Sequence, residues 1–331
     1  TLKLQSMWIG NHTAPILLVS LLVPIIHDFD SSSRYVKALL LGLAFSCNLG
    51  GMVTPISSLQ NILCVANLEK NGYTITFGQW MGLALPLCFS STVVCWGFLI
   101  LVLKPTDVRA IPVIPYDKRP FSVQHSFVLL SSFCTVLLWA TLSLTQGVLG
   151  DESVIALVFI VLMFGTGTLT TLDFNSFSWN LLVLIGGGNV LGLAVSSSSL
   201  LTSIVDALLP IIAGGTPFLV VAKVLCGVLL LTTFVSHTVS AIVMMPIVCT
   251  LGAKLGMPVL VPVSSALTIS AAMALPFSSF PNVNSLLVED DKGEPYLKTK
   301  DFLLTGVPFS VTMTLIIMTF GHVLIYAIAS P

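Results

Sequence analysis

The segment that decides the fold is TPISSLQN at residues 54–61, where an apolar run stops at a proline and gives way to two serines and an asparagine. The same pattern returns 221 residues later as LPFSSFPN at residues 275–282, again inside an apolar run. A bilayer offers no water to free backbone N–H and C=O groups, so a helix can be interrupted at membrane depth only where the gap lines a cavity walled by protein. Two such interruptions in corresponding halves of a chain are typical of a transporter substrate site.

The composition indicates a membrane protein. Of 331 residues, 55% are hydrophobic and only 8% are charged, and the mean hydropathy is +1.02, a balance foreign to soluble domains. The net charge of −1 gives no basic surface for a nucleic acid. The seven cysteines form no C-x-x-C pair and are expected to be small buried hydrophobes. We therefore predict an all-α polytopic membrane protein.

The apolar elements divide the chain into two repeats. The expected elements are residues 14–26, 36–49, 62–68, 83–103, 127–144, 154–169, 179–195, 200–213, 217–235, 240–251, 259–275 and 302–329. We assign residues 1–103 to a first repeat, 104–126 to a polar cytosolic connector and 127–331 to a second repeat. The sequence begins at Thr1 without an initiator Met or a signal-peptide layout, so we expect it to be an N-terminally truncated part of a longer protein.

The order of elements predicts that the repeats are inverted. A short segment, a broken segment and a full span occur in both halves, and three full spans are counted between the copies, at 127–144, 154–169 and 179–195. An odd number of crossings makes the copies point in opposite directions. Asp151 and Glu152 then fall on one side of the membrane, and the basic loop residues on the other, which we expect to be cytosolic. These basic residues are Arg34, Lys37, Lys104, Arg109, Lys118, Arg119, Lys292, Lys298 and Lys300.

Two further polar stretches precede the breaks. SMWIGNHTAP at residues 6–15 and TTFVSHTVS at residues 232–240 interrupt apolar sequence of about half the membrane thickness, as the tip of a re-entrant hairpin would. Each tip holds one histidine, His12 or His237, which is costly at membrane depth and therefore a functional candidate; the alternative is a satisfied core residue. Neither lies in a metal-binding motif, so no metal site other than one for Na⁺ is expected.

The breaks themselves offer groups for both an anion and a cation. The N-terminal amides of a restarted helix suit an anion, and the carbonyls of an ended one suit a cation such as Na⁺. Asn61 and Asn282 are expected to hold the unwound turns, with Pro55 and Pro281 as supporting residues. The alternative is that the Ser-Pro-Asn clusters are kinks packed on neighbouring helices.

These motifs together resemble the divalent anion:sodium symporter family, and most closely its fungal low-affinity phosphate transporter branch. The resemblance is carried by WIGN at 8–11, NLGGM at 48–52 running into TPISS, SHT at 236–238 and SFPN at 279–282. It covers nearly the whole chain. It implies an inverted-repeat fold with two re-entrant hairpins and two broken helices, a homodimer, and an elevator motion of the transport domain.

The resemblance also implies a set of binding residues. The Na⁺ sites would use Ser6, Gly10, Asn11 and Ser57, and Thr232, Ser236, His237 and Ser278. The anion would be bound by Asn11, His12, Thr13, Ser58, His237, Thr238 and Ser279. Where the family has Ser-Asn-Thr at each tip, this chain has GNH at 10–12 and SHT at 236–238. Gly10 removes a side-chain oxygen from the first cation site, and His237 replaces an amide ligand in the second. The Na⁺ stoichiometry therefore stays open.

The substrate prediction follows from the tips. A compact tetrahedral phosphate needs donors that converge on one point, and imidazoles at both tips add donors, so we favour inorganic phosphate over citrate or succinate. The absence of an Arg near either tip predicts low affinity.

The alternatives are proton coupling through His12 or His237, a Na⁺-coupled di- or tricarboxylate transporter and, below these, a passive anion channel. No nucleophile, base and acid are grouped at the breaks, so an enzyme is not expected and no cofactor is needed beyond Na⁺ or H⁺. We expect the plasma membrane, with the vacuolar membrane as the alternative.

Overall fold

The computed structural model describes residues 10, 13–27, 29–108, 122–141, 152–175 and 200–329, together with six isolated positions between 176 and 199. Within these residues the regular elements are helices, apart from one isolated antiparallel bridge between Glu289 and Pro295. Four of the described helices are long and apolar enough to cross a membrane: Phe77–Leu103, Pro217–Phe234, His237–Lys254 and Thr299–Ala327. The prediction of an all-helical chain with several membrane-length apolar helices is confirmed.

The first half contains a helix that is interrupted and then restarts. Helix α3 (Arg34–Gly50) begins at Ser33, whose hydroxyl accepts from the N–H of Val36, and ends at the pair Gly50-Gly51. An irregular turn follows at residues 51–58, and α4 (Leu59–Lys70) restarts the helix. The interruption therefore falls where the sequence predicted it, although α4 begins three residues earlier than the expected apolar run at 62–68.

The second half contains the corresponding interruption. Helix α14 (Leu260–Ala271) is followed by an extended stretch, a single 3-10 turn η1 (Pro276–Ser278) and α15 (Phe280–Leu286). The helix was expected to reach residue 275, and this prediction is wrong by four residues. The physical reason is a tertiary hydrogen bond, since the N–H of Met273 donates to Ser310 Oγ at 2.8 Å instead of continuing the helical ladder.

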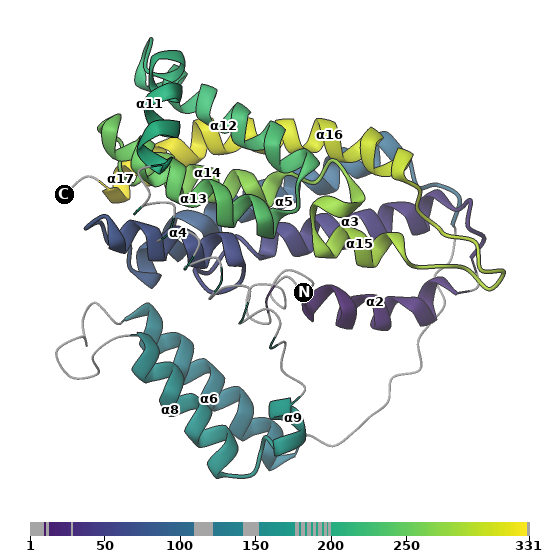
Figure 1. The fold of residues 1–331 in the computed structure, drawn as a ribbon. Helices are drawn as coiled ribbons and strands as arrows, with labels where there is room; N and C mark the ends of the chain where they lie inside the picture. Colours follow the sequence, from purple (N-terminus) through teal and green to yellow (C-terminus); the bar gives the residue numbers. More distant parts are fainter. Residues whose placement is uncertain are drawn as a thin grey trace.

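The two interrupted helices lie side by side at the centre of the protein (Figure 1). Helix α3 packs against α15, and α4 packs against α14, so the two segments pass each other in opposite directions with their gaps at the same level. Helix α2 (Thr13–Ile26) packs on α3 and α15. Helix α13 (His237–Lys254) packs on α14 and α4 in the same way. The core is thus formed by short helices around two gaps.

Longer helices cover this centre. Helix α5 (Phe77–Leu103) starts at a capping box in which Thr76 and Gln79 exchange hydrogen bonds, which extends it six residues beyond the expected start at 83. The others are α12 (Pro217–Phe234) and α16 (Thr299–Ile316), the latter continued by the π-helical η2 (Ile317–Gly321) and by α17 (His322–Ala329). Phe45 of α3 stacks on Phe309 of α16 at 5.3 Å between ring centroids, which ties the interrupted helix to the covering layer.

Four helices differ from the expected spans or lie at the margin of the bundle. Helix α6 (Val123–Ala140) packs against α8 (Glu152–Gly165), and Figure 1 shows this pair with α9 (Thr171–Asn175) below the other helices. Helix α6 meets the main bundle at α5, where Trp139 packs against Phe77 at 5.5 Å between ring centroids. Helix α8 has 14 residues, fewer than the roughly 20 needed to cross a bilayer, and most of 179–195 lies outside the described residues. The expected count of three full spans is therefore not met by the helices described. Helix α11 (Leu200–Ile212) places Asp206 in an ion pair with Lys254 of α13.

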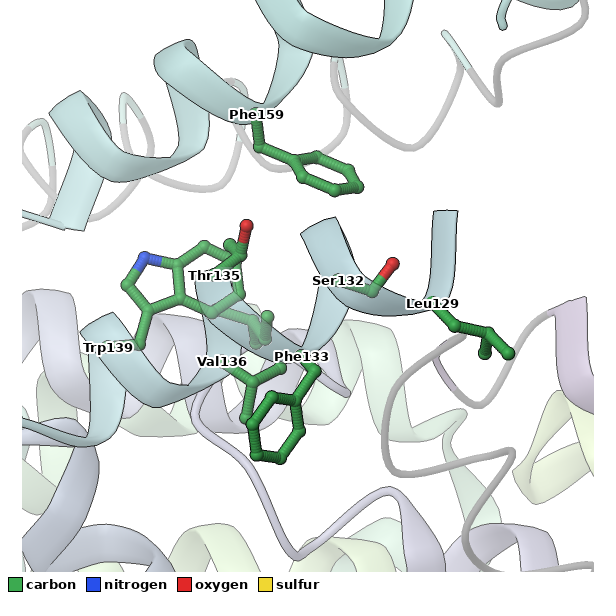
Figure 2. A pocket seen from close by; sticks show the side chains of 8 residues that line it. Leu129, Ser132, Phe133, Thr135, Val136, Trp139 and Phe159 are labelled. Carbon is green, nitrogen blue, oxygen red and sulfur yellow. The ribbon is translucent and has the colours of Figure 1, made fainter. Parts of the chain in front are cut away.

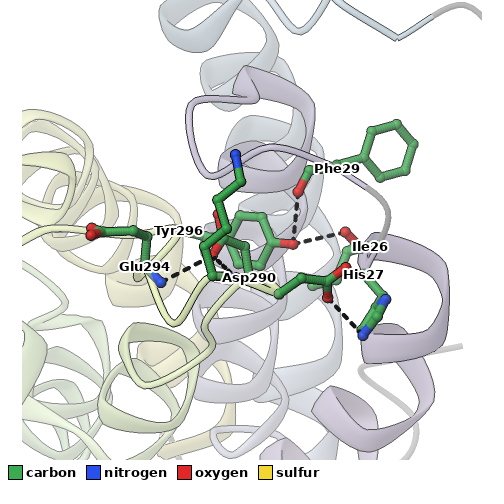
Figure 3. A network of polar contacts seen from close by, with 8 residues as sticks. Ile26, His27, Phe29, Asp290, Glu294 and Tyr296 are labelled. Carbon is green, nitrogen blue, oxygen red and sulfur yellow. Dashed lines mark hydrogen bonds and ion pairs between the residues drawn. The ribbon is translucent and has the colours of Figure 1, made fainter.

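One end of the bundle is fastened by polar contacts (Figure 3). The buried Tyr296 Oη reaches the carbonyl oxygens of Ile26 at 2.9 Å and Phe29 at 3.0 Å, and His27 pairs with Asp291 at 2.7 Å. Nearby, Lys37 pairs with Asp301 at 3.4 Å. The loop that leaves α15 is thereby held against the end of α2. The basic residues 34, 37, 104, 292, 298 and 300 lie at this end, whereas Arg109, Lys118 and Arg119 lie outside the described residues. That this end is cytosolic stays a prediction.

Candidate functional site

A cavity of about 200 Å³ opens where the second predicted hairpin tip (residues 232–240) meets the second gap (residues 272–279). Its lining combines the start of α13, the turn before α15 and one side chain of α4. The lining residues are Gln60, Ser236, His237, Thr238, Phe277, Ser278, Ser279, Phe280 and Val283. The structure therefore brings together five of the polar residues predicted for the site, and this described lining contains no Lys, Arg, Asp or Glu.

Ser279 is held so that its hydroxyl can donate a hydrogen bond to a ligand. Its Oγ accepts from Asn48 Nδ2 at 3.0 Å and from the N–H of Asn282 at 3.4 Å. No described residue accepts the Ser279 hydroxyl hydrogen. With its acceptor capacity directed at two protein donors, this hydroxyl lines the cavity as a donor, which is the property that an anion site requires.

The two gaps are braced by asparagines at equivalent positions. Asn61 Nδ2 donates to the carbonyl oxygens of Gly51 and Thr54, both at 2.8 Å. Asn282 Nδ2 reaches the carbonyl of Leu275 at 3.0 Å and that of Met273 at 3.4 Å. These bonds satisfy carbonyls that the broken ladders leave without helical partners.

The other serine of each pair serves its own turn. Ser57 Oγ contacts the carbonyl oxygens of Gly51 at 2.8 Å and Thr54 at 2.9 Å, and Ser278 Oγ donates to the carbonyl of Leu275 at 2.8 Å. Pro281 lies in the first turn of α15, where no backbone N–H is needed, and Pro55 is buried in the first gap. The hydroxyl hydrogens of Ser57 and Ser278 are therefore committed to local carbonyls, and a cation at these residues could use only the lone pairs of their oxygens and nearby backbone carbonyls.

His237 fastens the hairpin tip to the second gap. Its side chain is 4% exposed, and its Nε2 lies 2.8 Å from the carbonyl oxygen of Ala272, the residue that ends α14. Since a carbonyl only accepts, Nε2 carries the hydrogen in this contact. Ser236 caps α13, which begins at His237, by accepting from the N–H of Val239 at 3.3 Å. The positive end of the 18-residue helix α13 thus lies at the cavity.

The first hairpin tip is only partly described. Gly10 adopts φ +83°, and a Cβ at this position would lie 3.5 Å from the Ser57 carbonyl oxygen, so the tip lies against the first gap. Ser6, Asn11, His12 and the side chain of Thr13 lie outside the described residues. Ser58 and Thr232 are buried, and their hydroxyls have no hydrogen-bond partner among the described residues, but neither lines the cavity. Of the predicted binding residues, the structure therefore brings together those from the second half of the chain, apart from Thr232.

Several polar residues that position the site were missed by the sequence analysis. Asn48 Nδ2 bridges Ser279 Oγ and Asn282 Oδ1 from the neighbouring segment, Gln60 reaches the cavity, and Trp80 Nε1 donates to the Met52 carbonyl at 2.9 Å. The repeat could not reveal them, because positions 221 residues after Asn48 and Gln60 hold an isoleucine and a proline. A buried amide within an apolar helix was the available signal for Asn48.

A larger cavity of about 480 Å³ lies beside α6 and is not the candidate site (Figure 2). Its walls are mostly apolar side chains of α6, with Phe159 of α8 and Ile56 of the first gap. The polar groups of the lining side chains are the hydroxyls of Ser132 and Thr135 and the indole N–H of Trp139. It offers no converging donors for an oxyanion.

In the described part of the chain, membrane-length apolar helices surround two interrupted helices, and an uncharged polar cavity lies where the start of α13 meets the second gap. This is the architecture of a polytopic membrane transporter. The chain belongs to the citrate transporter family, whose model matches residues 4–153 and 151–330. The family identifies an integral membrane protein. Its members are transporters and not enzymes, in agreement with the sequence analysis.

Individual relatives refine this placement. The chain is 40% identical over 324 residues to the low-affinity phosphate transporter PHO90 of Saccharomyces cerevisiae, covering 96% of this chain and 36% of that protein. It is equally similar to the inorganic phosphate transporter PHO87 of the same yeast, with 34% of that protein covered. The sodium-dependent dicarboxylate transporter SdcS of Staphylococcus aureus is 26% identical over 84% of this chain and 59% of its own length. The resemblance found in the sequence is confirmed, and the chain spans about a third of the length of the two yeast relatives.

Proposed function

We propose that this chain forms the transport core of a secondary active transporter that moves inorganic phosphate across a membrane, coupled to Na⁺. The observation that carries the proposal is the uncharged cavity between the hairpin tip and the second gap, where the start of α13 and the hydroxyl of Ser279 converge. Partial charges and hydroxyl donors without a full cationic charge suit an anion that must be released as well as bound.

The size and donors of the cavity favour phosphate among small anions. A volume of about 200 Å³ suits a single compact oxyanion, and the start of α13 and the Ser279 hydroxyl line this one cavity. The two yeast relatives are named as phosphate transporters. Because no Arg or Lys lines the described cavity, binding lacks a bidentate charge-assisted pair and should be of low affinity.

Na⁺ is proposed as the coupling ion. The contact of Gly10 with the first gap leaves the Ser57 carbonyl near the tip, as a cation site with Ser6 and Asn11 would need. The second site is proposed at Ser236, His237 and Ser278, with Thr232 as the buried hydroxyl behind the tip. SdcS, a relative at lower identity, is named as sodium-dependent. A backbone carbonyl and neutral hydroxyls are suitable ligands for Na⁺ at a broken helix.

We further propose an inverted-repeat architecture and an elevator motion. The packing supports the first, since α2 contacts α3 and α15 while α13 contacts α14 and α4. The second follows the family resemblance, as do a homodimer, phosphate binding by Asn11, His12, Thr13, Ser58, His237, Thr238 and Ser279, and the plasma or vacuolar membrane as the location.

An ion-substitution uptake assay tests the proposal. The full-length protein in vesicles should accumulate ³²P-phosphate when an inward Na⁺ gradient is imposed, and replacing Na⁺ by choline should abolish accumulation. Uptake that does not saturate and shows no trans-stimulation would instead indicate a passive channel. Strong competition by citrate or succinate would indicate a di- or tricarboxylate carrier, the candidate that the family description and SdcS favour.

Proton coupling is the second candidate, because His237 lines the cavity and joins two of its walls. Uptake without Na⁺ under an acid-outside gradient would support it. His237→Asn keeps a donor near the Ala272 carbonyl but cannot titrate. If His237 couples protons, this variant should lose the pH dependence of uptake. An unchanged pH profile would make the imidazole a structural tie only.

A further inference from the structure

Gln60 differs from the other polar residues of the cavity in its origin. It lies in the first turn of α4, is 2% exposed, and is the one residue of the described lining that comes from the first half of the chain. The repeat offers no counterpart, since Pro281 occupies the equivalent position. The first half of the chain therefore supplies a long polar side chain to the cavity, and the second half has no equivalent residue.

The hydrogen bonds of Gln60 fix which end of its amide is committed. Its Nε2 donates to Ser270 Oγ at 2.5 Å. Ser270 Oγ in turn donates to the Ala266 carbonyl at 3.4 Å, so the serine oxygen is free to accept from Gln60 and its hydrogen is used elsewhere. No described residue donates to Gln60 Oε1. The amide therefore offers an acceptor oxygen at a cavity that is also lined by the donor hydroxyl of Ser279.

An acceptor in an anion site has a specific use. Phosphate at neutral pH still carries P–OH groups, whereas sulfate has none, so only phosphate can donate a hydrogen bond to a neutral acceptor. For sulfate the same oxygen faces only lone pairs, and a buried polar group left unpaired is costly. Ser279 does not distinguish the two ions, because it can donate to an unprotonated oxygen of either.

We propose that Gln60 is the specificity-determining residue of this cavity and selects protonated tetrahedral oxyanions over fully ionised ones by accepting a hydrogen bond from P–OH. The inference rests on the proposed function and adds the chemical class of anion that the site takes. Arsenate, which also carries OH groups, belongs to the selected class. Sulfate, although of similar size and shape, belongs to the rejected one.

Competition for ³²P-phosphate uptake by the full-length protein in vesicles tests this. In the wild type, arsenate should compete about as well as phosphate, and sulfate at least about tenfold less well, as expected for one hydrogen bond gained or left unpaired. Sulfate competing as well as arsenate would overturn the inference without any variant. A wild type that takes up no phosphate would instead refute the proposed function.

Variants then locate the effect. Gln60→Met keeps the length of the side chain without the acceptor, and Gln60→Leu provides a second replacement should the first fail to fold. In either, the KM for phosphate should rise and the preference for arsenate over sulfate should fall about tenfold. Asn67→Leu is the matched control, because Asn67 is a buried amide of the same helix that donates to the Leu63 carbonyl and does not line the cavity. Wild-type anion preference in a folded Gln60 variant would overturn the assignment.

Discussion

Replacing Asn48 by alanine should loosen the contact between the two interrupted helices. Asn48 is fully buried, and its Nδ2 joins α3 to the second gap by hydrogen bonds of 3.0 Å to Ser279 Oγ and 3.1 Å to Asn282 Oδ1. Two buried hydrogen bonds contribute roughly 1 kcal/mol each, and an acceptor left unpaired in the core adds a further penalty of about 1–3 kcal/mol. The expected loss is about 3–5 kcal/mol, with the Ser279 hydroxyl no longer held toward the cavity.

The assay compares thermal melting of the purified protein in detergent with phosphate uptake in vesicles. Asn48→Ala should melt several degrees below the wild type and lose uptake even at temperatures where it stays folded. Asn67→Ala is the control, since it removes one hydrogen bond within α4 and should lower the melting temperature less and leave uptake intact. An Asn48→Ala protein with wild-type melting and uptake would refute the view that this amide holds the two gaps together.

Three other changes follow from the same geometry. Ser279→Ala should reduce phosphate uptake at least about tenfold, whereas Ser264→Ala, at a buried hydroxyl with no described partner, should not; equal uptake in both would remove Ser279 from the site. Gly306→Ala should prevent stable folding, because its Cβ would lie 2.3 Å from the Met273 carbonyl oxygen; normal expression and melting would contradict this. Asp107→Ala should cost about 1 kcal/mol in melting experiments, since this carboxylate accepts from the Ser33 hydroxyl and two N–H groups at the start of α3. Burial raises the pKa of Asp107, but these hydrogen bonds outweigh burial and lower the pKa below the usual 3.8. The stabilisation by Asp107 should therefore persist at pH 5 and disappear only as the pH falls through the lowered pKa. A difference in melting temperature between Asp107→Ala and the wild type that vanishes at pH 5 would contradict this.

The sequence predicted the interruptions because they are encoded locally. Proline, paired serines and asparagine at fixed spacing determine where a helix stops and what satisfies its free carbonyls, and Asn61 and Asn282 make those contacts. The position of the second gap was displaced because Ser310, on a helix far along the chain, captures the Met273 N–H. A contact of that kind has no local pattern.

The same distinction explains which site residues the sequence revealed. The repeated motif revealed Ser278 and Ser279, and the polar hairpin tip revealed His237, since each lies in a duplicated stretch. Asn48 and Gln60 reach the cavity or its walls from single-copy positions, so only the packing of α3 on α15 and of α4 on α14 exposes their roles. Likewise, α6 begins at Val123, four residues before the expected start at 127, because Ser122 and His125 form a capping box.

The most direct test of the central claim is an experimental structure of the full-length protein determined with and without phosphate. The account predicts that density for a tetrahedral anion appears only with phosphate, between the start of α13 and the second gap, within hydrogen-bond distance of Ser279 Oγ. Continuous helices through residues 51–58 and 272–279, or an anion bound away from both gaps, would contradict it.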